Sequence, residues 1–234
     1  MKLKVLFDKD SQDPRYASGW GLAYLLDGRL LFDTGEKGEY LLENLRVLQI
    51  DAARVEMIVI SHAHWDHTGG LSAFLDLHRH ASVAGCAEAE NLLSLPSGTR
   101  FVPVTEGQEL IPGVWTSGCL TTRYHDAPLA EQALFVKTGS GIAVLSGCAH
   151  PGILSFVELA RHCFPEEPLT FVGGGFHLIN RDPREIRYIA DKMKQMGVQR
   201  VGPSHCSGYE AFEIFQQVFG SDCVRLKVGK EVEV

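Results

Sequence analysis

The chain has 234 residues, of which 45% are hydrophobic and 22% are charged, the proportions of an ordinary soluble globular protein. A formal net charge of −7 and the lack of any lysine- and arginine-rich run exclude the basic surface that nucleic-acid binding requires. No segment approaches the ~20 apolar residues of a membrane span, and the N-terminal apolar run is too short for a secretory signal. We therefore expect a cytoplasmic protein without nucleic-acid or membrane partners; the sequence indicates no oligomeric state.

Short apolar segments separated by turn residues predict many strands and several helices. The first half is expected to hold a strand over 2–7, a hairpin of 20–26 and 29–32 across Asp27-Gly28, a helix over 38–48, a strand over 57–60 and a helix over 70–78. The second half is expected to hold strands over 101–104, 109–111 and 114–117, a loop over 118–131, a hairpin of 132–137 and 142–145, helices over 153–162, 183–196 and 209–219, and strands over 169–172, 198–201 and 224–228.

Hairpins alternate with strand-helix units in this order, and no linker divides them. Two stacked sheets covered by helices explain that order better than a doubly wound parallel sheet, which would lack so many hairpins. The length and the missing linker predict one domain over residues 1–234.

The most informative segment is SHAHWDHTGG, residues 61–70, which directly follows the apolar run 57–60. His62 and His64 are two residues apart and share a face in extended backbone, whereas Asp66 and His67 are adjacent and point in different directions. Four ligands divided in this way predict a site for one or two divalent metal ions. Imidazole and carboxylate donors favour zinc, with iron or manganese as alternatives.

The segment HAHWDH resembles the H-x-H-x-D-H signature of the metallo-β-lactamase fold superfamily. Segments 19–22, 31–35, 64–70, 146–152, 174–178 and 205–208 together resemble the group called metal-dependent hydrolases of the β-lactamase superfamily II, which includes dihydropterin-ribofuranosylaminobenzene-phosphate synthase. The resemblance implies an α/β fold of the αββα sandwich type, in which two mixed sheets pack face to face with helices on both outer faces. It also implies that Asp33 holds the metal loop through hydrogen bonds without touching metal.

The segment SGCAHPG, residues 146–152, departs from this pattern, because most superfamily members carry Gly-Asp here and the Asp bridges the metals. We expect His150 to be a ligand, since a loop preceding a helix can present it. Cys148 can ligate as a thiolate, bridge two metals or lie beside the ligands. Superfamily members usually carry a further, separate histidine ligand that has no match in this sequence, so His150, His125 or Cys119 is expected to supply that ligand.

Two further histidines follow predicted strands. The resemblance implies that His205 is the final superfamily ligand. Cys206 is expected to point away from its neighbour His205, because neighbours in extended backbone point to opposite sides, and to be a packing residue instead of a ligand. His177 follows Gly173-Gly174-Gly175 and matches a segment in which phosphodiesterase members carry a proton-donating histidine; a buried structural histidine is the alternative.

These residues predict a hydrolase in which metal-activated water attacks an ester or phosphoester of a small anionic molecule. Asp66 is expected to double as proton acceptor and His177 to protonate the leaving group. Two alternatives stay open: a phosphoribosyl-type transferase like the synthase, and a metal-dependent sensor without catalysis.

Overall fold

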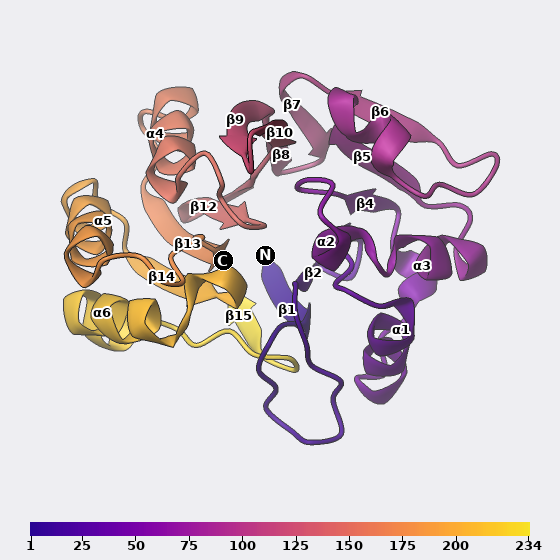
Figure 1. The fold of residues 1–234 in the computed structure, drawn as a ribbon, viewed down its shortest axis with the longest axis horizontal. Coiled ribbons are helices and arrows are strands. Elements are labelled where there is room, and N and C mark those ends of the chain that lie inside the picture. Colours follow the sequence, from indigo (N-terminus) through magenta and orange to yellow (C-terminus); the bar gives the residue numbers. More distant parts are fainter. The chain divides into compact units, whose positions relative to one another are not determined.

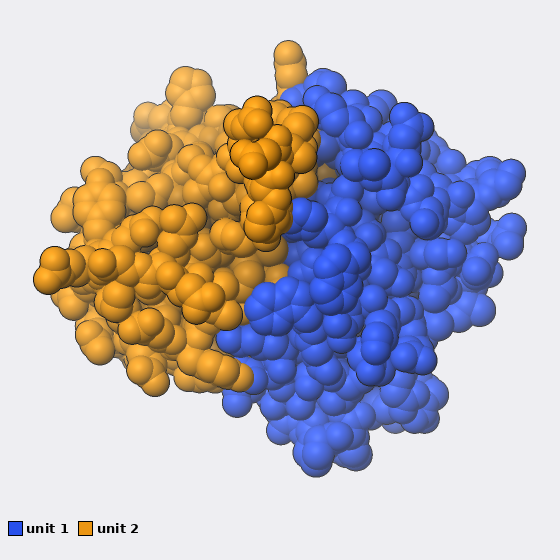
Figure 2. Space-filling model, viewed as in Figure 1, with its two compact units in different colours: residues 1–105, 227–233 blue, residues 106–226, 234 orange.

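The computed structural model describes residues 1–234 and divides them into two compact units. Unit 1 comprises residues 1–105 and 227–233, and unit 2 comprises residues 106–226 and 234 (Figure 2). Each unit is built around one large sheet, and helices flank the sheet in both (Figure 1). The expected mixed α/β fold with two large sheets is confirmed. A single domain over residues 1–234 stays a prediction.

Unit 1 contains a seven-stranded sheet in the order β15-β1-β2-β3-β4-β5-β6. The strands are β1 (Lys2–Phe7), β2 (Ala23–Leu26), β3 (Leu30–Phe32), β4 (Met57–Val59), β5 (Ser82–Cys86), β6 (Phe101–Val104) and β15 (Glu231–Glu233). Strands β3 to β6 pair in parallel, whereas β15, β1, β2 and β3 pair antiparallel. The parallel strands matter for function, because their carboxyl ends open at one edge of the sheet.

Three α-helices belong to unit 1: α1 (Gly38–Val47), α2 (Trp65–Thr68) and α3 (Leu71–Leu77). Leu41 and Leu45 lie four residues apart on α1 and are both buried, which is the spacing of an amphipathic helix face. They join Phe74 of α3 and Ile58 of β4 in one apolar cluster. The expected Asp27-Gly28 turn is present, with positive φ at both residues.

Unit 2 contains a six-stranded sheet in the order β14-β13-β12-β11-β8-β7 and a separate two-stranded sheet of β9 and β10. The strands are β7 (Glu106–Ile111), β8 (Val114–Gly118), β9 (Leu120–Tyr124), β10 (Ala127–Glu131), β11 (Leu134–Thr138), β12 (Gly141–Ser146), β13 (Leu169–Gly175) and β14 (Arg200–Ser204). Strands β12, β13 and β14 are parallel neighbours.

The helices of unit 2 are α4 (Ile153–Cys163), α5 (Pro183–Gln195) and α6 (Tyr209–Phe219), seen along one side of its sheet in Figure 1. Their apolar faces bury Phe156, Ile186 and Phe215 in one cluster with sheet residues such as Val144. Helix α5 begins at the expected proline, and the Asp182 carboxylate accepts a hydrogen bond from the backbone N–H of Arg184. No helix in the structure combines the length and the apolar character of a membrane span.

Two sequence expectations are wrong. Residues 118–131 form the β9-β10 hairpin instead of a loop, with His125 and Asp126 at positive φ in its turn. Its strands, LTTRY and APLAE, are largely exposed or half-buried and lack the alternation of apolar and polar residues that indicates a strand. Residues 224–228 form no strand; the final strand is β15.

Replacing Phe156 by alanine should lower the free energy of unfolding by about 3–5 kcal/mol, because the ring is fully buried and its loss leaves a cavity. Urea denaturation followed by circular dichroism measures the change. Tyr188 on α5 is 62% exposed, so Tyr188→Ala is the matched control and should change stability by less than about 1 kcal/mol. Equal losses in the two variants would contradict the packing described for unit 2.

Candidate metal centre

Residues that follow parallel strands carry the chemistry of both units. In unit 1, Asp33 follows β3, and Ser61 and His62 follow β4. In unit 2, three consecutive parallel strands end at donor residues: Cys148 and His150 follow β12, His177 follows β13, and His205 and Cys206 follow β14. Because parallel strands present their carboxyl ends at one edge, each sheet gathers its own donor group there.

The donor group of unit 1 consists of the four predicted residues of the metal loop, His62, His64, Asp66 and His67. Nε2 of His62 lies 3.0 Å from Nδ1 of His64, and the ring centroids of His62 and His67 are 4.2 Å apart. Nε2 of His67 lies 3.6 Å from Oδ2 of Asp66. The structure thus brings the four side chains together, and His62, Asp66 and His67 are buried.

A buried carboxylate, Asp33, holds this loop in place. It accepts hydrogen bonds from the backbone N–H and the hydroxyl of Ser61, each at 2.7 Å, and lies 2.7 Å from Nδ1 of His67. Burial raises the pKa of the Asp33 carboxyl above its usual value, although the charge and hydrogen bond of His67 and the hydrogen bonds from Ser61 oppose it. Asp33 has a φ of 57°, a backbone conformation that costs energy in most residues and is maintained here by these hydrogen bonds.

The glycines that end the motif are required by close backbone approach. A Cβ on Gly69 would overlap the backbone carbonyl of Glu36, and a Cβ on Gly70 would overlap that of Thr34. Thr34 also holds the metal loop, because its backbone N–H and its hydroxyl both donate hydrogen bonds of 2.9 Å to the carbonyl oxygen of His67. The Gly-Gly pair therefore lets the metal loop lie directly against the segment that follows β3.

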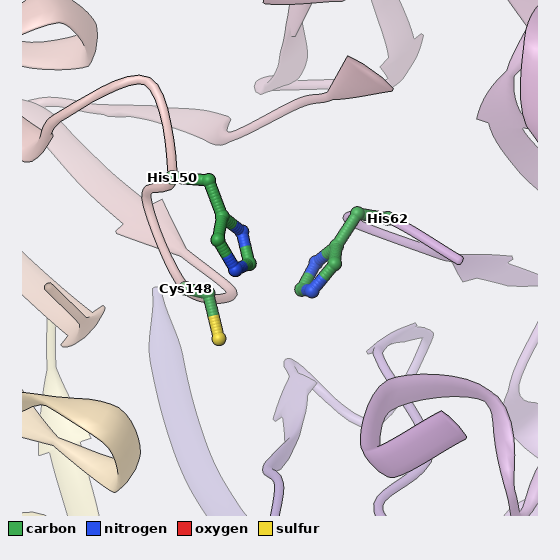
Figure 3. A group of neighbouring side chains, drawn as sticks. All are labelled: His62, Cys148 and His150. Carbon is green, nitrogen blue, oxygen red and sulfur yellow. The ribbon is translucent and has the colours of Figure 1, made fainter. Parts of the chain in front are cut away.

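In unit 2 a second buried carboxylate, Glu131, holds the loop that carries Cys148 and His150. Oε1 accepts hydrogen bonds from the backbone N–H groups of Cys148 at 2.9 Å and Ala149 at 2.7 Å, and Oε2 accepts that of His150 at 2.8 Å. Nδ1 of His150 also lies 2.8 Å from Oε2. Figure 3 shows that Cys148 and His150 come from this one loop, whereas His62 comes from the loop after β4.

The charge state of Glu131 follows from these contacts. Burial raises the pKa of its carboxyl, but the hydrogen bond and charge of His150 and the backbone hydrogen bonds outweigh it, so the pKa lies below its usual value. Glu131 is therefore an ionised acceptor at neutral pH. Glu131 was not among the residues predicted from the sequence, because a single glutamate at the end of a short strand has no local signature; its position just before Gln132 and the buried β11 is the only signal.

His177 and the His205-Cys206 pair complete the donor group of unit 2. The rings of His177 and His150 are 4.4 Å apart, and Nδ1 of His177 is buried without a hydrogen-bond partner. Tyr124 of the β9-β10 hairpin packs its ring edge against both histidines, at 4.7 and 5.6 Å. The β9-β10 hairpin, which the sequence did not predict, therefore places an aromatic side chain against two of the donor residues.

The expectation that Cys206 points away from its neighbour His205 is wrong, since the Cys206 thiol and the His205 side chain are hydrogen-bonded. The backbone at His205 is not extended, since its φ is 46° and a 3-10 turn begins there. The turn places the Cys206 sulfur 3.3 Å from the Cys148 sulfur. Burial raises the pKa of the Cys206 thiol, but its hydrogen bond with Cys148, the charge of His205 and hydrogen bonds with His177 and His205 outweigh it, so the pKa lies well below its usual value.

The donors in both units fit a divalent metal. Three imidazoles have Nδ1 engaged by a protein oxygen: His62 by the Ser61 hydroxyl, His67 by Asp33 and His150 by Glu131. A hydrogen bond at Nδ1 fixes the ring orientation and directs Nε2, on the other side of the ring, toward a ligand position. This is the usual arrangement of metal-binding histidines, in which a carboxylate or hydroxyl anchors the second ring nitrogen.

Comparison with known proteins agrees with this description. The family model described as the metallo-beta-lactamase superfamily matches residues 21–131. The chain is 28% identical to 7,8-dihydropterin-6-methyl-4-(beta-D-ribofuranosyl)-aminobenzene-5'-phosphate synthase of Methanocaldococcus jannaschii over 262 residues, 91% of this chain and 89% of that protein.

Solved structures support the same fold. A metal-dependent hydrolase of the beta-lactamase superfamily aligns with a TM-score of 0.80 and 28% identity, covering 100% of this chain and 99% of that one. The short form of human tRNase Z aligns with a TM-score of 0.63 and 16% identity over 100% and 99% of the two chains, which shows likeness of fold alone. Residues 21–131 therefore match the model of the metallo-beta-lactamase superfamily, whose members are mostly metal-dependent hydrolases. The chain is similar to both a hydrolase and a synthase.

Replacing Glu131 by glutamine should lower the free energy of unfolding by about 2–3 kcal/mol, because hydrogen bonds to a buried charge are lost and an amide N–H₂ then faces backbone donors. The ionised Glu131 carboxylate contributes to the free energy of unfolding at neutral pH, and this contribution is lost as the pH falls through its lowered folded-state pKa. Thermal and urea unfolding of the metal-free protein measure both effects. Glu158→Gln, on the exposed face of α4, is the control, and equal stability of the two variants would sink the assignment.

Proposed function

We propose that this protein is a metal-dependent hydrolase that cleaves an ester or phosphoester bond in a small anionic molecule. The observation that carries the proposal is the anchoring of Nδ1 in His62, His67 and His150, which directs three Nε2 atoms toward ligand positions. Two of these anchors, Asp33 for His67 and Glu131 for His150, are buried carboxylates, and burying such a charge costs free energy that a packing role alone would not offset.

The proposed metal ligands are those predicted from the sequence, His62, His64, Asp66, His67, Cys148, His150 and His205. Nitrogen, oxygen and sulfur donors of this kind suit zinc, with iron or manganese as alternatives. One or two divalent ions held by these residues would supply Lewis acidity and lower the pKa of water. The protein's part is to orient the donors, which Asp33 and Glu131 do.

Two residues are proposed to move protons. Asp66, whose carboxylate is buried beside His67, accepts a proton from the attacking water. His177 donates a proton to the leaving group. Its buried Nδ1 carries no hydrogen bond within the protein, so this nitrogen is available to a bound molecule.

A small recess beside His177 supports an anionic substrate. It has a volume of about 120 Å³ and is lined by His150 and His177, by apolar residues, and by Arg181 of the segment before α5 and Glu185 of α5. The guanidinium of Arg181 lies 3.6 Å from the Glu185 carboxylate and is half exposed, so it can turn toward a ligand at little cost. We propose that it meets the negative charge of the substrate.

A second candidate function is transfer of a phosphoribosyl-type group. The similarity to the Methanocaldococcus synthase favours it, because that alignment covers most of both chains. Cys148 also favours it, since the resemblance places this residue where an aspartate usually bridges two metals, and a thiol there weakens the activation of water. In that case the metal would bind pyrophosphate, and water would have to be excluded.

The first test is metal content by inductively coupled plasma mass spectrometry on untagged protein, followed by turnover of bis-p-nitrophenyl phosphate with the metals found. The proposal expects at least one bound divalent ion per chain and turnover that a chelator abolishes and zinc restores. Bound metal without turnover of esters or phosphodiesters would favour the transferase, assayed with a pterin and phosphoribosyl pyrophosphate. A chain that stays metal-free after reconstitution would refute the proposal.

Two variants separate metal binding from proton transfer. His64→Ala should lower the bound metal and abolish turnover, because it removes a donor. His177→Ala should keep the metal and lower kcat by about 10²–10⁴-fold, the range expected for loss of a general acid. Metal content and kcat are measured on the same samples, and His162→Ala on α4 serves as control. Loss of metal from the His177 variant would show that this residue is a ligand instead.

A further inference from the structure

Cys148 and Cys206 form a buried thiol pair, although they come from two different loops of unit 2. Their sulfur atoms lie 3.3 Å apart, and the two residues are only 4% and 3% exposed. We propose that Cys148, His205 and Cys206 form a thiolate-rich site for a thiophilic divalent ion of the zinc type. The inference deepens the proposed metal centre and rests on it, because it adds Cys206 as a ligand and assigns Cys148 as a direct one.

The local backbone directs both thiols and an imidazole to one place. His205 adopts φ 46° at the end of β14, and its imidazole contacts the neighbouring Cys206 thiol. Glu131 holds the backbone of Cys148 through a hydrogen bond of 2.9 Å. On the other side, a Cβ on Gly175 would lie 2.7 Å from the Cys206 sulfur and would also overlap the carbonyl of Gly147. The glycine therefore makes the room in which the two sulfurs meet.

Packing alone does not explain this pair. Cys223, in the same unit, is buried in the apolar cluster, and burial raises the pKa of its thiol to about 12, as for an inert core cysteine. Cys148 and Cys206 instead face each other with their sulfurs 3.3 Å apart, and the donor atoms of Cys148 and His205 lie within 4.8 Å of one another. Two sulfurs and a nitrogen at such separations match the spacing of ligands around one tetrahedral ion.

The chemistry of this set differs from that of the metal loop. The donors of unit 1 are imidazoles and a carboxylate, which accept zinc, iron or manganese alike, whereas two thiolates select zinc and other soft ions. A Cys₂His set leaves a fourth position open, as catalytic zinc sites require. The donor atom of His177 lies within 4.8 Å of both sulfurs, so His177 would be close to a molecule bound at such an ion, consistent with the proton-donor role proposed above.

Cobalt(II) reports directly on thiolate ligands and stands in for zinc. The reduced, metal-free full chain is titrated with cobalt(II) without oxygen, and absorption is recorded in the near ultraviolet, where sulfur-to-cobalt charge transfer appears. We expect this band in the wild type, a roughly twofold loss of absorbance per bound cobalt in Cys148→Ser and in Cys206→Ser, and no band in the double variant. Cys223→Ser and Cys163→Ser are the controls and should match the wild type.

Cobalt binding without the charge-transfer band, or a band that Cys206→Ser leaves unchanged, would overturn the inference. If a serine variant fails to fold, alkylation of the wild type by iodoacetamide, mapped by mass spectrometry, is the alternative test. Zinc should protect Cys148 and Cys206 together from alkylation and leave Cys163 reactive. Equal labelling of Cys148 and Cys206 with and without zinc would refute the site. The outcomes separate the two proposals. Phosphodiester turnover without the charge-transfer band would refute only the thiolate site, whereas the band without turnover would refute only the proposed hydrolase function.

Discussion

The hydrogen bonds that two buried carboxylates accept organise the donor loops of both units. Asp33 holds Ser61 and His67 in unit 1, and Glu131 holds the backbone of three successive residues and the His150 imidazole in unit 2. Both carboxylates are completely buried, so their desolvation must be offset by these contacts. Without them the donor histidines would lose both their position and the direction of Nε2.

The two carboxylates meet the cost of burial in different ways. Glu131 receives three backbone N–H donors as well as an imidazole, and the pKa of its carboxyl is lowered in spite of burial. Asp33 receives one backbone donor, a hydroxyl and an imidazole, and burial raises its pKa. A positive ion bound by His67 would favour the ionised form of Asp33. Metal binding at His67 would therefore be coupled to the charge of Asp33, whereas the Glu131 anchor is already formed by the polypeptide.

Strained backbone accompanies the site in both units. Asp33, Ala149, His177 and His205 all have positive φ although none is glycine. Each follows the end of a strand by a few residues, where the chain must turn sharply to bring a donor to the sheet edge. Such conformations persist only when surrounding contacts hold them, which explains the many hydrogen bonds and close glycine contacts nearby. Strained backbone conformations that lower the stability of the fold are typical of sites that position reactive groups.

The sequence by itself determined the helices, most strands and the metal loop, because these depend on local periodicity and on ligand spacing within a few residues. It also pointed to His150, His177 and His205, since each follows an apolar strand. Only the tertiary structure decided the roles of Glu131 and Cys206. Glu131 acts on residues 17 to 19 positions away, and Cys206 meets a thiol 58 positions away. The first contact follows from the antiparallel pairing of β11 with β12 and the second from the parallel order of β12, β13 and β14. No local pattern records which distant side chains such pairing brings together.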